Sequence, residues 1–132
     1  MEKETIQHDG VILAKIIYRN DLDIGTHFYT PNDSLIQIGK LIHPQGKMIK
    51  PHKHTPVHIE ADQPPQEVLY IETGKVKVAF YSLEDKWVCS RIVKAGDTLL
   101  LMNGGHSFEM LEKTVMLEVK QGPYTPDNRK DL

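Results

Sequence analysis

The stretch 46-GKMIKPHKHTPVHIEADQPPQEVLYIETG-74 carries two histidines separated by one residue and, further on, a glutamate that opens a β-branched run. Side chains two residues apart in an extended strand point to the same face, about 7 Å apart. A strand over 48–54 would therefore turn His52 and His54 toward one metal ion. Glu67 is in phase with the apolar residues that follow it at alternate positions, which predicts a carboxylate on the inward face.

A second segment, 96-GDTLLLMNGGHSFEM-110, adds a third histidine, His106, in phase with Phe108 and Met110. We expect this imidazole to face an apolar interior, because strand side chains alternate between two faces. Three imidazoles and one carboxylate are ligands that divalent transition metals accept. The sequence therefore predicts one metal site with the ligands His52, His54, Glu67 and His106.

The first segment resembles the first motif of the cupin family: a glycine, five residues, His-X-His, a short spacer, a glutamate, six residues and a glycine. The matching residues are Gly46, His52, His54, Glu67 and Gly74. The spacer has three or four residues in cupins and twelve here, Thr55–Gln66. The resemblance implies that the predicted ligands hold a divalent metal. An insertion beside metal ligands is expected to form a lid, a substrate-contact loop or a solvated connector.

The second segment resembles the second cupin motif less closely. Gly96, Gly104 and His106 match its glycine, glycine and histidine positions. Met102 stands in place of a proline, Met110 stands in place of an asparagine, and the loop before the histidine is one residue shorter. The turn before the histidine is therefore expected to differ from that of a cupin.

The insertion also offers alternative ligands. His58 lies where a three-residue spacer would place the glutamate, and Glu60 is close to it in the sequence. Glu67 is the preferred ligand, because its spacing to Gly74 is kept and it opens a strand in the inward phase. Whether His58 or Glu60 replaces it stays open.

Short apolar runs separated by turn residues predict an all-β fold. The expected strands cover 11–18, 26–30, 35–43, 48–54, 67–72, 75–82, 86–93, 97–101, 105–111 and 115–120. Many short strands at close spacing, with no helical period, indicate a sandwich or a barrel. The cupin resemblance narrows this expectation to a double-stranded β-helix, which is a jelly-roll barrel.

The chain has 132 residues, which is the length of one domain. We expect a single cupin domain over 1–132, with N-terminal strands over about 1–34, the barrel over about 35–120 and a tail over 121–132. Cupins that resemble this chain commonly pair through their N-terminal strands, and the open edges of jelly-roll sheets need cover. A homodimer is therefore expected.

Sixteen basic and eighteen acidic residues give a net charge of −2. No long run of either sign occurs, so neither nucleic acid nor a membrane surface is a predicted partner. The single Cys89 excludes an internal disulfide, and no apolar run approaches the roughly 20 residues of a membrane span. The polar N-terminus lacks the apolar region of a signal peptide. These features predict a cytoplasmic protein.

The resemblance leaves three functions open. The first is a metal-dependent enzyme, an oxygenase or an isomerase, acting on a small polar or carbohydrate-like molecule. The second is a non-catalytic module that binds a metal and a small ligand. The third is a metal-free sugar epimerase, against which the retained ligand set argues. The ligand set gives little basis for choosing among Mn, Fe, Ni, Co, Cu and Zn.

Overall fold

The computed structural model describes residues 2–20, 23–56, 64–121 and 130–132. These residues form antiparallel strands and no helix, and hence no helix that is long and apolar enough to cross a membrane. The strands are β1 (Lys3–His8), β2 (Val11–Ile17), β3 (Gly25–Phe28), β4 (Gly39–Ile42), β5 (Glu67–Thr73), β6 (Lys75–Tyr81), β7 (Trp87–Lys94), β8 (Thr98–Leu101), β9 (Gly105–Met110) and β10 (Val115–Lys120).

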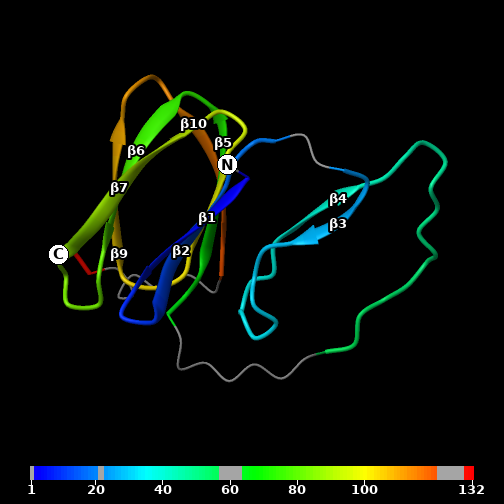
Figure 1. The fold of residues 1–132 in the computed structure, drawn as a ribbon, viewed down its shortest axis with the longest axis horizontal. Coiled ribbons are helices and arrows are strands. Elements are labelled where there is room, and N and C mark those ends of the chain that lie inside the picture. Colours follow the sequence, from blue (N-terminus) through cyan, green and yellow to red (C-terminus); the bar gives the residue numbers. More distant parts are fainter. Residues whose placement is uncertain (1, 21–22, 57–63, 122–129) are drawn as a thin grey trace. The chain divides into compact units, whose positions relative to one another are not determined.

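The chain divides into two compact units. The two-sheet unit, Met1–Arg19 with Pro64–Leu132, holds a five-stranded sheet in the order β1-β2-β8-β5-β10 and a three-stranded sheet in the order β7-β6-β9 (Figure 1). The hairpin unit, Asn20–Gln63, holds the antiparallel pair of β3 and β4. The expectation of a single domain over 1–132 stays a prediction.

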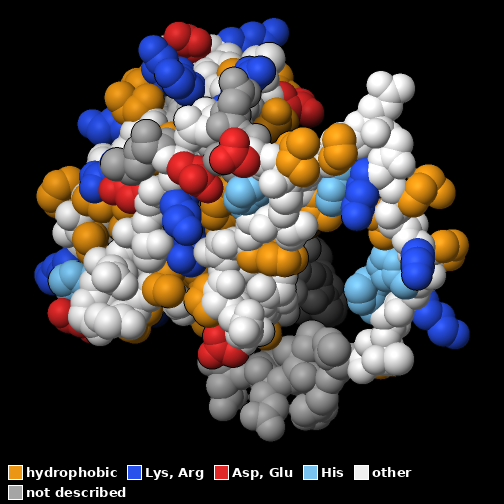
Figure 2. Space-filling view, turned by 45° about the vertical axis from the view of Figure 1, so that its right-hand side comes forward, with side chains coloured by type: hydrophobic (Ala, Val, Ile, Leu, Met, Phe, Trp, Pro, Cys, Tyr) orange, Lys and Arg blue, Asp and Glu red, His pale blue; other side chains and the backbone are white. Residues whose placement is uncertain are grey.

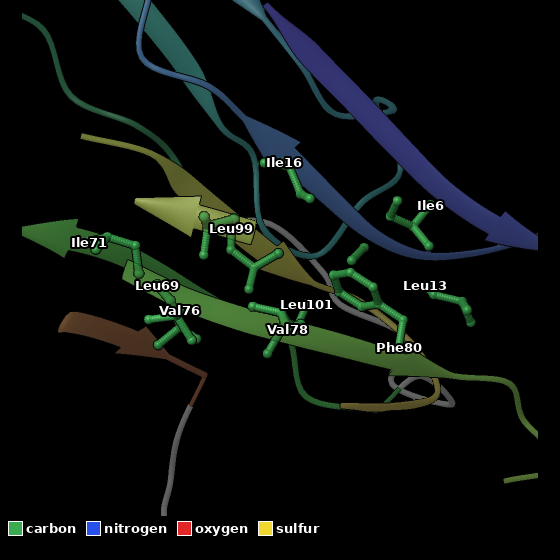
Figure 3. Close-up of a cluster of buried hydrophobic side chains, with 12 residues drawn as sticks. Ile6, Leu13, Ile16, Leu69, Ile71, Val76, Val78, Phe80, Leu99 and Leu101 are labelled. Carbon is green, nitrogen blue, oxygen red and sulfur yellow. The ribbon is translucent and has the colours of Figure 1, made fainter. Parts of the chain in front are cut away.

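The core of the two-sheet unit lies between its two sheets (Figure 3). On β6, Val76, Val78 and Phe80 are buried, whereas Lys77 on the opposite face is exposed. This alternation is expected of a strand with one face on the core and one in water. The buried cluster consists of Ile6, Leu13, Ala14, Ile16, Leu69, Ile71, Val76, Val78, Phe80, Val93, Leu99 and Leu101.

The prediction of an all-β chain is confirmed, and every predicted strand except 48–54 has a counterpart. The strand predicted over 48–54 is wrong, because these residues form no strand. Pro51 lies in the middle of this segment and has no N–H to donate to a neighbouring strand. β1 is a strand that we do not predict, because Ile6 is its only buried apolar residue.

Glycines of the two cupin-like motifs lie in turns that need a positive φ. The angles are +87° at Gly46, +100° at Gly74, +93° at Gly96 and +73° at Gly104. A Cβ at Gly74 would lie 2.5 Å from the carbonyl oxygen of Lys113, and one at Gly104 would meet the carbonyl oxygen of Tyr81. Backbone requirements alone therefore select glycine at these two positions.

Candidate functional site

Glu67 opens β5 on the inward face of the five-stranded sheet. It alternates with Leu69 and Ile71, which are both buried, so the predicted inward phase is confirmed. Its direct cross-strand partners are Leu101 on β8 and Lys120 on β10. The side chain of Glu67 is only 19% exposed, so its carboxylate is more deeply buried than the imidazole of His106, which is 33% exposed.

His106 lies opposite Phe80 in the three-stranded sheet, and therefore on the face that carries the buried side chains of β6. Its ring contacts Phe108, with a centroid separation of 5.4 Å. The side chain is nevertheless 33% exposed, so the ring lies at the margin of the core rather than inside it. The expected inward face is correct, but β9 is an edge strand and leaves the ring partly in water.

Burial lowers the pKa of His106, and this effect outweighs the opposite influence of Glu67 and Glu118. The neutral imidazole is therefore favoured near neutral pH. A metal ion binds histidine in the neutral form, so this environment suits a ligand.

Glu67 and His106 meet across the two sheets. The distance from Glu67 Oε2 to His106 Nε2 is 3.8 Å, and that from Glu67 Oε1 to Lys120 Nζ is 3.4 Å. The carboxylate thus lies between an imidazole and an ammonium group. Two of the four predicted ligands are adjacent, as the sequence predicts.

His52 and His54 belong to the hairpin unit, and both are exposed. Their rings lie edge to face, with centroids 5.2 Å apart. His52 Nδ1 is 2.9 Å from the carbonyl oxygen of Lys50, and since a carbonyl can only accept, Nδ1 donates. This bond leaves Nε2 as the nitrogen of His52 that would bind a metal. Figure 2 shows histidine side chains at the surface beside lysine side chains.

The predicted ligands therefore form two pairs, one in each unit. In neither unit do the described residues bring three or more His, Cys, Asp or Glu side chains together as a metal site. The alternative ligands His58 and Glu60, and positions 57–63 of the insertion, lie outside the described residues.

Lys120 and Glu118 are site residues that the sequence analysis misses. In β10 they alternate with Leu117 and Val119, and the apolar side chains are the outward ones, 53% and 57% exposed. From the sequence, this alternation suggests the opposite orientation, with leucine and valine inside. The register against β5 decides the matter, because it sets Glu118 opposite Leu69 and Lys120 opposite Glu67.

The two-sheet unit also has a hollow of about 550 Å³ lined by Tyr18, Arg19, Lys94, Ala95 and Asp97. The buried carboxylate of Asp97 accepts hydrogen bonds from the backbone N–H groups of Arg19 and Lys94, both at 2.9 Å. These bonds tie the carboxylate to the end of β7 and to the residues that follow β2. Asp97 therefore has a structural role.

No family model matches the chain, and neither a curated protein nor a solved structure shows significant similarity to it.

Proposed function

We propose that this chain is a metalloprotein of the cupin type that binds one divalent transition metal through His52, His54, Glu67 and His106. The observation that supports the proposal most directly is the contact between Glu67 and His106, at 3.8 Å. The two side chains come from different sheets, and the imidazole is held in an environment that favours its neutral form.

The path of the chain supports a jelly-roll arrangement for the two-sheet unit. After β7, each strand lies in the sheet opposite to that of the strand before it: β8 and β10 in the larger sheet, β9 in the smaller one with β7. A meander would keep successive strands in one sheet, whereas a jelly roll alternates them between two. The five-stranded and three-stranded sheets together supply the eight strands of a jelly roll.

The donor set fits a divalent metal ion. His52 donates through Nδ1 to a backbone carbonyl, which is the usual way in which a ligating histidine is oriented. Three neutral imidazoles and one carboxylate suit Mn, Fe, Ni, Co, Cu or Zn. Such an ion supplies Lewis-acid chemistry or activation of a bound small molecule.

The function we favour is that of an oxygenase or an isomerase acting on a small polar or carbohydrate-like molecule. A non-catalytic module for a metal and a small ligand is the alternative, and turnover with a bound ligand separates the two. A metal-free sugar epimerase is the third candidate, and metal bound by the natively purified protein would contradict it. The single Cys89, partly buried on β7, is compatible with the reducing cytoplasm.

Elemental analysis of natively purified protein tests the metal site. We expect about one divalent ion per chain in the wild type and a large loss in the variant His52→Ala/His54→Ala. The matched control is His8→Ala/His27→Ala, which also removes two imidazoles. Neither residue belongs to the predicted ligand set; His8 pairs with Asp9, and His27 Nε2 bonds the Asp23 carbonyl. Equal metal content in the two double variants would refute the assignment.

A further inference from the structure

The hollow of the two-sheet unit is bordered by two cationic side chains that the proposed metal site does not use. Arg19 follows β2 and Lys94 ends β7, and the other lining residues are Tyr18, Ala95 and Asp97. All five belong to the two-sheet unit. Arg19 and Lys94 are exposed, and within the described part of the chain neither side chain forms an ion pair. Both cations are therefore open to a ligand that enters the hollow.

Asp97 holds the backbone of both basic residues in place. Its buried carboxylate accepts a hydrogen bond from the Arg19 N–H through Oδ1 and one from the Lys94 N–H through Oδ2, both at 2.9 Å. The N–H of Asp97 donates in turn to the carbonyl oxygen of Lys94 at 2.9 Å, which closes the turn before β8. The two basic positions thus keep their spacing without a ligand, and binding need not order this backbone.

Gly96 lets the side chain of Arg19 lie across this turn. The φ of Gly96 is +93°, and a Cβ at this position would lie 3.1 Å from Arg19 Cβ and 3.2 Å from Arg19 Cγ. The aliphatic stem of Arg19 therefore occupies the space that a larger residue at position 96 would need. Because this packing holds the stem beside the hollow, it is mainly the guanidinium end that a ligand would have to order.

The charge and the size of the hollow favour a phosphate group on a small organic molecule. Two backbone N–H groups satisfy the carboxylate of Asp97, which leaves the guanidinium and the ammonium for the ligand. A phosphate monoester carries a charge of about −1.5 to −2 near pH 7 and therefore matches two cations better than a carboxylate does. Arginine binds phosphate through two parallel N–H groups, and lysine binds it as a point charge. The volume of about 550 Å³ is that of a small-molecule site.

We propose that this hollow binds a small phosphorylated molecule, with the phosphate between Arg19 and Lys94 and the organic part against Tyr18 and Ala95. The hydroxyl of Tyr18 already donates to Glu4 at 3.1 Å, so Tyr18 contributes its ring and Ala95 contributes its methyl group. The hollow shares no residue with the candidate metal site, and the inference does not depend on the metal proposal.

Calorimetric titration of the purified full chain with phenyl phosphate and with benzoate tests this proposal. Benzoate has the same ring and a single negative charge, and we expect it to bind the wild type about tenfold more weakly. Arg19→Gln and Lys94→Gln should each weaken the binding of phenyl phosphate about tenfold, because each removes a charged hydrogen-bond donor. Arg19→Lys should bind it more tightly than Arg19→Gln does.

The matched control is Lys86→Gln, since Lys86 is an exposed lysine that precedes β7 whereas Lys94 ends it. This variant should bind phenyl phosphate like the wild type, and an equal loss would show a general effect of net charge and refute the site. A wild type that binds neither anion, or both equally, also refutes it. So does unchanged affinity in Arg19→Gln and Lys94→Gln. Lys94→Gln retains the backbone N–H that bonds Asp97, so this variant keeps the turn and tests the contact of the side chain alone.

Discussion

Among single residues, Glu4 makes the best-supported charged contact of the two-sheet unit. Its carboxylate accepts from Arg91 Nε at 3.1 Å and Nη2 at 3.0 Å, and from the Tyr18 hydroxyl at 3.1 Å. Arg91→Met should lower the free energy of unfolding by about 1–3 kcal/mol, because it leaves a largely buried carboxylate short of donors.

Urea unfolding of Arg91→Met measures this loss. The control is Glu112→Gln, which breaks the more exposed pair with Lys75 at 3.8 Å and should cost less than about 1 kcal/mol. Equal effects of the two changes would contradict a special role for the Glu4 contact.

Tyr18 gives a pH dependence with a defined sign. Burial and, secondarily, its hydrogen bond to Glu4 raise the pKa of Tyr18 above its usual value of 10.0. The folded chain therefore keeps the phenolic proton at a pH where the unfolded chain has begun to lose it. This contribution to stability is complete below pH 10 and falls as the pH rises through the folded pKa. In urea unfolding between pH 8 and 11, Tyr18→Phe should show a shallower alkaline loss than the wild type, and parallel curves would contradict the prediction.

Alanine substitutions at Gly74 and Gly10 distinguish the cost of backbone strain from the cost of steric overlap. Both have positive φ, but a Cβ at Gly10 would meet nothing within 4 Å, whereas one at Gly74 would meet the backbone of Lys113 and Thr114. Gly10→Ala should cost about 1–2 kcal/mol, the usual strain of a left-handed residue. Gly74→Ala should cost about 1–3 kcal/mol more, because the overlap is with backbone. Thermal unfolding of the two variants checks the difference.

At the scale of the element, identical substitutions on β6 and β10 compare an inward with an outward position. Val78 is fully buried and Val119 is 57% exposed. Val78→Ala should lower the free energy of unfolding by about 2 kcal/mol, at roughly 0.8 kcal/mol for each buried carbon plus a cavity cost. Val119→Ala should change it by less than about 0.5 kcal/mol. Chemical denaturation measures both, and equal losses would place Val119 in a buried interface.

Most strands are predictable because each contains several β-branched or apolar residues between turn residues. β1 is not predicted because Ile6 is its only buried residue. The strand forms because it pairs with β2 in a hairpin. The signal that would have revealed it is Asp9-Gly10, a two-residue hairpin turn with φ of +49° and +76°. Segment 48–54 is predicted as a strand but forms none. Its alternating histidines suggest a strand, whereas Pro51 lacks the backbone N–H that a strand would donate.

For the whole molecule, the sequence predicts the strand face of Glu67 and of His106 correctly, because buried neighbours fix the phase of each strand. Phase alone does not reveal that His106 is partly exposed, since that follows from the position of β9 at a sheet edge. Nor does it reveal Lys120, whose orientation depends on pairing with a strand about 50 residues earlier in the chain. Long-range register is the information that a single sequence lacks.

The homodimer stays a prediction. The edge strands of the larger sheet are β1 and β10, and we expect pairing through β1 and the other N-terminal residues. Light scattering at micromolar concentration should give twice the chain mass. Leu117→Lys, which charges the outward face of β10, should leave that mass unchanged, and a monomer in this variant alone would move the interface to β10.

The pairing of β10 with β5 is interrupted once, between Val115 and Met116. Val115 faces Thr73 and Met116 faces Ile71, so Glu72 has no partner of its own. If the register of the pair Val115–Thr73 continued along the strand, Leu117 would face Ile71 and Val119 would face Leu69. Apolar side chains would then fill the inward positions of β10. The one-residue offset gives up that hydrophobic burial and turns Glu118 and Lys120 inward. The register of β10 against β5 thus decides whether the side chains at the margin of this core are apolar or charged, although the amino acids of β10 are the same in both registers.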